Sequence, residues 1–287
     1  MRKQLREIYR ILLWVGEKIF DAQAIKKFDA YFRFHKRLDL KNPTTLSEKI
    51  CWLELNEANP MTSLCSDKYA VRKYVQDKGL EDLLVPLYGG AYSDPDEIDF
   101  ESLPNQFVLK ATHGCEMNII CEDKQALNWE KAKAQMRYWL HTPQWRMCLE
   151  PHYLSIQPRI ICEKYLGNMA SMIDYKFHCL NGEPQFVLVC FDRDKKLKLN
   201  IYDLQWNKLD EICDSHRSDK IIPPPTKLKE MISASRVLAK DFKFVRVDLY
   251  EINGVVYFGE LTFTPGTGIL PYFSDRFLLE YGEKLQI

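Results

Sequence analysis

Hydrophobic residues recur along this chain at two spacings, and each spacing predicts a different kind of element. Near the start they are three or four residues apart, as at Ile8, Leu12 and Val15, so residues 1 to about 60 are predicted to be helical. Pro43 and the two threonines after it suit the start of a helix. The individual helices predicted from this period cover residues 46–55, 67–75, 129–140 and 228–239.

Elsewhere apolar residues alternate with polar ones or form short runs, which is typical of strands. Some of these runs flank short loops and predict antiparallel hairpins, one around residues 112–117 and another around Asn181-Gly182. The predicted strands cover residues 83–88, 107–111, 118–121, 159–163, 173–180 and 185–191. Antiparallel sheets with interleaved helices indicate an α+β fold.

The segment 244–268 carries the strongest chemical signal. Two strand-like runs flank Asn253-Gly254, with Asp248 on the first and Glu260 on the second. A half-buried strand seldom carries acids on its inner face unless a cation or a basic partner compensates them. With Arg246 beside them, two such carboxylates are what a hard divalent metal and a phosphate chain require.

The register of this hairpin decides whether the acids meet. Side chains alternate faces, so a plain two-residue turn would turn Asp248 and Glu260 to opposite faces. We predict a three-residue loop ending in a left-handed Gly254, or an equivalent bulge, which places Glu260 opposite Arg246 and diagonal to Asp248. The alternative is a simple Arg246–Glu260 pair on a solvated sheet face.

Composition narrows the classes of protein. Forty basic residues balance 40 acidic ones, which argues against a general nucleic-acid binder. The nine cysteines are scattered without a C-x-x-C pair, which indicates a reducing cytoplasm and no cysteine-ligated zinc. Serine-hydrolase, P-loop and dinucleotide-binding motifs are absent.

The N-terminus begins basic and becomes apolar. No apolar run is long enough for a transmembrane helix, and the segment fits a signal peptide poorly. We expect a surface helix docked on the domain. An interfacial membrane helix is the alternative, supported by Trp14 and the basic flank.

Further polar residues lie at strand ends. Lys110 precedes a loop that contains Gly114, and the lysine and the loop together could cradle phosphate. A lysine that reaches solvent is the simpler interpretation. Glu163 ends a strand, and the hinge that follows through Lys164 and Leu166 could read an adenine edge. A surface Glu-Lys pair is the alternative there.

Asp174 and Lys176 share one face of a strand. This pair suits a ribose hydroxyl and a phosphate, or else a cross-strand ion pair. His113, in the loop with Gly114, is a conceivable substrate contact.

Taken in order, these residues resemble the ATP-grasp superfamily, and more closely the TupA-like ATP-grasp family associated with bacterial cell-surface polysaccharide and teichuronopeptide. The resemblance runs from about residue 42 to the C-terminus. It is carried by Leu46-Ser-Glu-Lys-Ile-Cys-Trp-Leu, Asp67-Lys-Tyr-Ala-Val-Arg, Leu103-Pro-Asn-Gln-Phe-Val-Leu-Lys, Asp174-Tyr-Lys-Phe and Phe258-Gly-Glu-Leu-Thr-Phe.

The resemblance implies two lobes with antiparallel sheets that clamp ATP, and a role for each candidate residue. Lys110, Gly114 and its loop would contact phosphates; Glu163, Lys164 and Leu166 would hold adenine, and Asp174 ribose. Lys176 would face the phosphates or substrate, and Arg246 would stabilise an oxyanion. Asp248, Glu260 and Thr262 would hold Mg²⁺, although many relatives have Asn at the position of Thr262.

The implied organisation is a helical region at 1–60, a small region at 61–104, a lid lobe at 105–166 and a catalytic lobe at 167–287. The implied activity is ATP-dependent amide formation between an amine or amino acid and a carboxylate of a cell-surface glycan or its precursor. The alternatives are a phosphotransferase or glycosyltransferase of capsule assembly, and a non-catalytic partner of a membrane assembly complex. We expect a cytoplasmic protein. The alternative is that its N-terminal helix makes peripheral contact with the inner face of the membrane.

Overall fold

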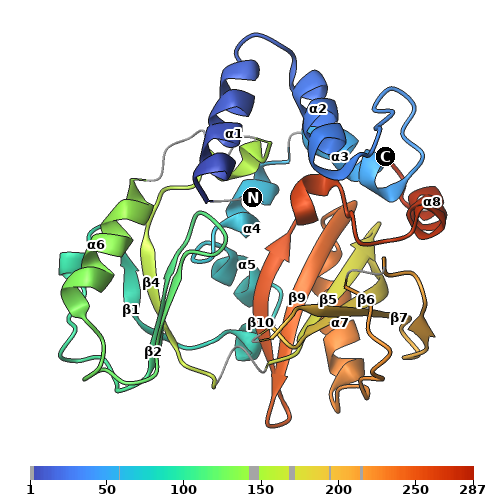
Figure 1. Cartoon of the computed structure of the whole chain (residues 1–287). Helices are drawn as coiled ribbons and strands as arrows, with labels where there is room; N and C mark the ends of the chain where they lie inside the picture. The colour runs from blue at the N-terminus through green and yellow to red at the C-terminus, as the bar shows by residue number, and fades with distance from the viewer. Residues whose placement is uncertain (1–2, 58, 142–148, 168–171, 194, 214–215) are drawn as a thin grey trace. The chain divides into compact units, whose positions relative to one another are not determined.

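The computed structural model describes residues 3–57, 59–141, 149–167, 172–193, 195–213 and 216–287 (Figure 1). Its residues form two compact units. Residues 60–167 make one unit, and residues 1–59 together with 168–287 make the other. Both units combine helices with an antiparallel sheet, so the predicted α+β class is confirmed.

The unit of residues 60–167 contains a four-stranded antiparallel sheet in the order β1-β4-β2-β3. Helix α6, with Met136 and Trp139, packs in the same apolar cluster as Phe107 and Leu109 of β2. Because side chains alternate along β2, Lys110 projects to the face opposite Leu109. The elements of this unit are α4 (Pro60–Ser66), α5 (Val71–Asp77), β1 (Leu87–Tyr92), β2 (Phe107–Ala111), β3 (Asn118–Cys121), α6 (Trp129–Leu140) and β4 (Ile160–Lys164).

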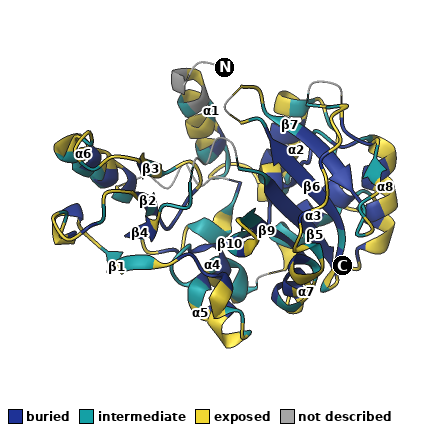
Figure 2. Cartoon of the chain, turned by 90° about the horizontal axis from the view of Figure 1, so that it is seen from below, coloured by how far each residue is buried: buried dark blue, intermediate teal, exposed yellow. Residues whose placement is uncertain are grey.

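The other unit contains a six-stranded antiparallel sheet in the order β10-β9-β5-β6-β7-β8. Its central strands are almost wholly buried, as Figure 2 shows for β5, β6 and β9. The elements of this unit are α1 (Lys3–Gly16), α2 (Ala22–Phe34), α3 (Leu46–Asn56), β5 (Asp174–Leu180), β6 (Glu183–Phe191), β7 (Lys198–Tyr202), β8 (Lys208–Leu209), α7 (Leu228–Ala239), β9 (Phe244–Ile252), β10 (Val255–Thr262) and α8 (Asp275–Lys284).

Helices cover this sheet unevenly, and that leaves room for polar residues. On one face Leu180 and Phe186 pack with α3 and α8 in a single apolar cluster. The same face of β5 continues through His178 to Lys176 and Asp174, whose neighbours on β6, Leu188 and Cys190, still belong to that cluster. Helix α7 packs against β5, β6 and β9. The polar residues of β5 therefore lie along the border of the apolar cluster.

The N-terminal helices join this unit through α3. Thr45 caps α3 and accepts from the backbone N–H of Glu48, whose carboxylate accepts from the Thr45 backbone in return, which forms a capping box. Ser47 of α3 also donates to the backbone oxygen of Ile269, at 2.6 Å. The predicted helical N-terminal region is confirmed.

Two predicted boundaries were wrong. The helix expected over 67–75 begins at Val71, because Asp67 is used in a turn whose backbone N–H groups at Tyr69 and Ala70 donate to its carboxylate. The strand expected over 83–88 lies at 87–92 instead, where it pairs with β4 through a bulge. No helix in the described part of the chain combines the length and hydropathy needed to span a bilayer.

Candidate functional site

The hairpin of β9 and β10 combines a tight turn with a bulge. Asn253 and Gly254 have φ of 52° and 75° and form a two-residue turn, so the predicted three-residue loop is wrong. The alternative prediction of a bulge is confirmed, because the register shifts by one residue at Gly259. Glu260 consequently lies opposite Asp248, and Thr262 opposite Arg246, instead of the predicted pairing of Glu260 with Arg246.

Glycine suits the bulge for a steric reason. A Cβ at residue 259 would lie 2.7 Å from Tyr250 Cε2 and 3.0 Å from the backbone oxygen of Asp248. The bulge returns Glu260 to the face that carries Arg246 and Asp248. The local sequence Phe258-Gly259-Glu260 thus brings the two acids together.

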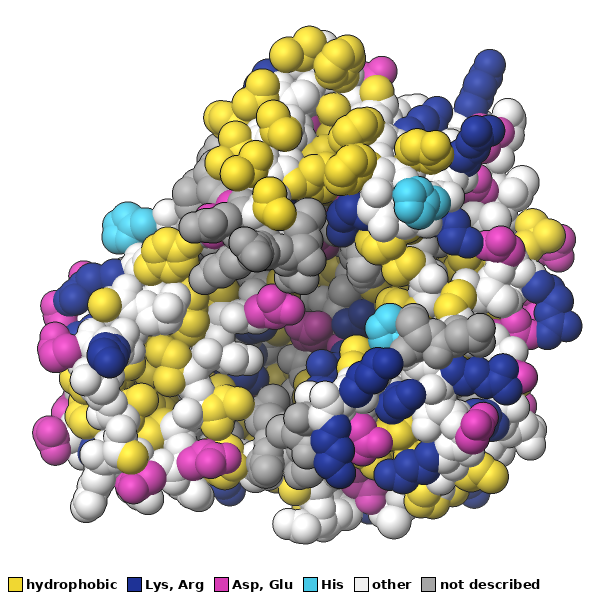
Figure 3. Space-filling model, viewed as in Figure 1, with side chains coloured by type: hydrophobic (Ala, Val, Ile, Leu, Met, Phe, Trp, Pro, Cys, Tyr) yellow, Lys and Arg dark blue, Asp and Glu magenta, His cyan; other side chains and the backbone are white. Residues whose placement is uncertain are grey.

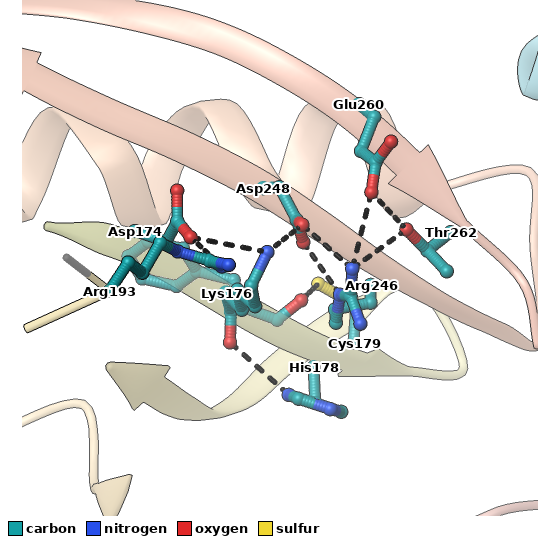
Figure 4. A network of polar contacts seen from close by, with 10 residues as sticks. Asp174, Lys176, His178, Cys179, Arg193, Arg246, Asp248, Glu260 and Thr262 are labelled. Carbon is teal, nitrogen blue, oxygen red and sulfur yellow. Dashed lines mark hydrogen bonds and ion pairs between the residues drawn. The ribbon is translucent and has the colours of Figure 1, made fainter. Parts of the chain in front are cut away.

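Arg246 joins the polar residues of this hairpin (Figure 4). Its Nε and Nη2 donate to the two carboxylate oxygens of Asp248, each at 2.7 Å, in a bidentate arrangement. Nη2 also donates to Thr262 Oγ1 at 3.0 Å and to Glu260 Oε1 at 3.3 Å. Thr262 donates in turn to Glu260 Oε1, at 3.1 Å. Arg246 is only 9% exposed, which excludes a pair on a solvated face.

Strand β5 brings a second group of charges to the same place. Lys176 lies opposite Asp248 in the sheet and its Nζ forms an ion pair with Asp248 Oδ2. The same Nζ is 3.9 Å from Asp174 Oδ2. Arg193, which follows β6, forms an ion pair with Asp174. Basic and acidic side chains therefore alternate across the face (Figure 4).

Burial and charge act in opposite directions on these groups. Burial by itself would raise the pKa of Asp248, but Arg246 and Lys176 hold that pKa below its ordinary value. Burial would lower the pKa of Arg246, but Asp248 raises it above its usual value. Both side chains are consequently charged near neutral pH, and each offsets the desolvation of the other.

Two rings flank the charges: His178 is buried and Tyr250 is half-buried. His178, with no measurable exposure, contacts the backbone oxygen of Lys176 through Nδ1 at 3.2 Å and stacks on Phe186 at 4.4 Å. Burial, and then the charge of Arg246, lower the pKa of His178 well below its ordinary value. Burial and then Asp174 raise the pKa of Tyr250 well above its ordinary value. Both rings are therefore neutral at physiological pH.

In the unit of residues 60–167, the candidate nucleotide residues also form a pair. Lys110 Nζ lies 2.6 Å from Glu163 Oε2, on neighbouring strands β2 and β4. Arg72 of α5 is close enough for the charge of Glu163 to affect it: burial lowers the pKa of Arg72, and Glu163 partly offsets this effect. Lys110 therefore contacts an acid on the neighbouring strand and does not simply extend into solvent.

The loop after Lys110 is anchored at several points. Lys68 Nζ donates to the backbone oxygen of Gly114, at 2.6 Å. His113 is buried, and its Nε2 lies 3.0 Å from the backbone oxygen of Trp139. The backbone N–H of Thr112 donates to the backbone oxygen of Arg159 at 2.9 Å, and Arg159 in turn forms an ion pair with Asp67 at 3.0 Å. His113, considered as a substrate contact, is instead only 3% exposed and packs inward.

The remaining candidates lie near the end of β4. Lys164 has an exposed side chain, and its backbone N–H donates to the oxygen of Pro86 at 2.9 Å. Leu166 is half-buried. The prediction missed Arg193 and Lys68, because an arginine in a loop and a lysine in a turn carry no periodic signal. The alternation of Arg246, Asp248 and Tyr250 along β9 could have revealed Tyr250.

The donor set of the hairpin fits a hard cation only in part. Asp248 and Glu260 carry carboxylates on adjacent strands. Both oxygens of Asp248 already accept from Arg246, so a cation would have to share them, whereas Glu260 Oε2 takes no part in the bonds to Arg246 and Thr262. Among the described residues, however, no group of three or more His, Cys, Asp or Glu side chains could hold a metal. Further ligands would have to come from a bound molecule, as phosphate oxygens do for Mg²⁺.

The chain matches the family described as TupA-like ATPgrasp over residues 48–286. No curated protein sequence matches it significantly. Similar solved structures include D-alanine–D-alanine ligase from Bacillus anthracis complexed with ATP, with 18% identity, 70% of this chain and 55% of that chain covered, and a TM-score of 0.40.

Two others are L-amino acid ligase from Bacillus licheniformis and N5-carboxyaminoimidazole synthase from Aspergillus clavatus in complex with ADP and 5-aminoimidazole ribonucleotide. The first has 13% identity, coverage of 78% of this chain and 48% of that one, and a TM-score of 0.46. The second has 11% identity, coverage of 78% and 52%, and a TM-score of 0.43. The chain thus spans about half the length of these structures, and such distant likeness carries no argument about substrate or residue roles.

Proposed function

The chain belongs to the TupA-like ATP-grasp family, and we propose that it is an ATP-dependent carboxylate–amine ligase acting on a cell-surface glycan or its precursor. The observation that supports this proposal best is the convergence of Asp248, Glu260 and Arg246 on one sheet face, with Lys176 beside them. Such a group can bind a metal-bound phosphate chain and also stabilise an oxyanion.

In the proposed reaction, an oxygen of the substrate carboxylate attacks the γ-phosphorus of ATP, and ADP leaves. The resulting acylphosphate is attacked at its acyl carbon by the amine, which loses a proton, and inorganic phosphate leaves as the amide forms. Lys176 would bind the transferring phosphoryl group. Arg246 uses Nε and Nη2 for its partners among the described residues, so its Nη1 protons are the donors we assign to the oxyanion.

We assign Asp248 and Glu260 as the residues that would hold Mg²⁺, with Thr262 supplying a weaker hydroxyl oxygen. The ion would neutralise the phosphate charge that develops during transfer. Asp248 keeps its orientation through the bidentate contact with Arg246. Glu260 is the more accessible of the two, with a side chain 38% exposed against 1% for Asp248.

Nucleotide binding would involve the other candidates. We assign Lys110 and the loop with Gly114 to the phosphates, Glu163, Lys164 and Leu166 to adenine, and Asp174 to ribose. The ion pair of Lys110 and Glu163 means that nucleotide binding must share or open that contact. In this proposal residues 105–166 act as the lid lobe and 167–287 as the catalytic lobe.

Isothermal titration calorimetry with ATP, with and without Mg²⁺, tests the assignment on the wild type and on Glu260→Gln. The glutamine keeps the size of the side chain and its hydrogen bonds but removes a charged ligand, so we expect Mg²⁺-dependent affinity to fall by at least about ten-fold. Glu183→Gln is the control, because Glu183 is exposed and pairs with Arg236 on the same unit.

Mg²⁺-dependent binding that Glu260→Gln leaves intact would refute the metal assignment. The products then separate the classes of enzyme. Release of ADP and phosphate that requires both a carboxylate and an amine supports a ligase, whereas a phosphorylated or glycosylated acceptor supports a transferase of capsule assembly. A non-catalytic partner of an assembly complex would bind no Mg-ATP.

A further inference from the structure

Exposed apolar side chains are concentrated on the two N-terminal helices. Of the eighteen large hydrophobic side chains that are exposed in the described part of the chain, ten lie between Leu5 and Phe32. Figure 3 shows hydrophobic side chains gathered over α1 and α2, at the top of the view. Soluble proteins seldom expose so many large apolar side chains together without a partner.

On α1 the exposed residues form a single stripe. Ile8, Leu12 and Val15 follow helical spacing and are all exposed, Leu12 by 64%. The side of the helix next to this stripe faces α2: the rings of Tyr9 and Phe32 stack at 5.0 Å, and Tyr9 donates to Asp29 at 3.0 Å. Helix α1 is therefore a surface helix, as expected: it contacts α2 with one side and leaves its apolar stripe exposed.

The apolar surface continues onto α2. Phe28, Tyr31 and Phe32 are each more than half exposed. Ile19 and Phe20, in the connection between the helices, are exposed by 71% and 60%. Because the Tyr9–Phe32 stack joins the two helices, these side chains extend the stripe of α1 into one surface, which we call the α1–α2 surface.

Charge in this region has the opposite sign to the rest of the chain. Residues 1–40 contain ten Lys or Arg and five Asp or Glu, a net charge of +5, so the remainder of the neutral chain carries −5. Arg10, Lys18, Lys27 and Arg37 are exposed there. Lys18 also lies 5.5 Å from the ring of Trp14.

We propose that the α1–α2 surface binds an anionic lipid bilayer. The apolar side chains would enter the boundary between headgroups and acyl chains, and the surrounding basic residues would approach lipid phosphates. With 14 and 13 residues, α1 and α2 are too short to span the bilayer, so the contact is peripheral. Self-association through the same surface is disfavoured, because it would bring together two copies of a segment whose net charge is +5.

Vesicle flotation tests this proposal with the full chain. The probes are phosphatidylcholine vesicles and vesicles of phosphatidylcholine and phosphatidylglycerol in a ratio of about seven to three. We expect binding to the anionic vesicles, little binding to the neutral ones, and loss of binding as salt is raised, since salt screens the basic residues.

The double variant Leu12→Glu/Phe28→Glu should bind the anionic vesicles at least about ten-fold more weakly, because it removes apolar contact and adds charge. Its matched control is Ile221→Glu/Leu279→Glu, which makes the same change of charge at exposed apolar residues elsewhere on the unit. The control should lose much less binding. Leu12→Gln/Ile19→Gln serves as a second variant should the glutamates disturb folding.

Several results would overturn the proposal. They are absence of wild-type binding to anionic vesicles, equal binding to both kinds of vesicle, and equal losses in the surface and control variants. Concentration-dependent oligomers that the surface variant abolishes, without vesicle binding, would assign the surface to a second copy. Mg-ATP binding should be unaffected by these substitutions, so failure here does not refute the ligase proposal.

Discussion

At the scale of single residues, the buried carboxylate of Asp248 is stabilised by two cations. Arg246 binds both of its oxygens, and Lys176 contacts one of them from the neighbouring strand. A buried charge that loses its partner is costly, typically by about 3–5 kcal/mol, so these three residues depend on one another. The alternation rule predicted that Arg246 and Asp248 share a face, but the pairing of β5 with β9, which adds Lys176, is a long-range contact without a local signal.

His178 makes the stability of the protein depend on pH. Its pKa in the folded chain lies well below the ordinary value of 6.5, so the unfolded chain binds a proton more readily as pH falls through that value. The free energy of unfolding should therefore decrease below about pH 6.5, by up to about 1.4 kcal/mol per pH unit. His178→Phe keeps a ring to stack on Phe186 and should flatten this dependence, as measured by denaturant unfolding between about pH 5 and 8.

His141→Gln is the control for that experiment, because His141 is exposed at the end of α6. The free energy of unfolding of this variant should depend on pH as steeply as that of the wild type. An unchanged slope in His178→Phe would show that other groups, such as His113, whose pKa burial also lowers, cause the acid sensitivity.

At the scale of elements, the bulge in β10 sets the arrangement of the acids. Gly259→Ala would place a methyl group 2.7 Å from the Tyr250 ring and 3.0 Å from the Asp248 oxygen. We expect thermal denaturation to show a loss of stability of about 1–3 kcal/mol, because backbone and ring cannot both move aside.

Gly254→Asn is the matched substitution in the same hairpin. Gly254 has φ of 75° with nothing within 4 Å of an added Cβ, and asparagine tolerates this conformation. It should cost less than about 1 kcal/mol. A larger loss in Gly254→Asn than in Gly259→Ala would contradict the role given to the bulge.

Sequence reasoning located elements well where the signal was local. The hairpin strands 107–111 and 118–121 and the helices 129–140 and 228–239 have the predicted bounds, since each combines a clear period with a turn or cap. Strand β7 was missed, because lysines and Asn200 interrupt its apolar residues. Helix α8 was missed too: it contains Gly282, a poor helix former, where an added Cβ would lie 2.1 Å from the Thr44 oxygen.

At the scale of the complete chain, two features stand out: distant segments join in one compact unit, and the charges of the candidate site sum to zero. Residues 1–59 join residues 168–287 in one compact unit. Periodicity cannot predict this grouping, because α3 and α8, which contact each other, are far apart in the sequence. Within that unit, Asp174, Asp248 and Glu260 face Lys176, Arg193 and Arg246, so three formal negative charges balance three positive ones.

A neutral cluster should bind a metal only together with an anion. We expect Mg-ATP at about a hundred times its dissociation constant to raise the free energy of unfolding by about 2.7 kcal/mol, and Mg²⁺ alone to have little effect. Thermal shift measurements with Mg²⁺, with ATP and EDTA, and with both Mg²⁺ and ATP distinguish these cases. Strong stabilisation by Mg²⁺ alone would mean that the chain itself completes a metal site.

The extra residue in β10 also bears on how this pair of acids can be recognised elsewhere. If Gly259 were deleted, regular pairing from the tight turn would still put the glutamate across from Asp248, since the bulge absorbs one residue without altering which neighbours meet. Deletion of Gly259 should thus disturb the pairing of Asp248 and Glu260 less than the substitution Gly259→Ala does. A sequence search that fixes the number of residues between the two acids would miss hairpins that lack the bulge. A comparison of the residues that pair across the strands would find them.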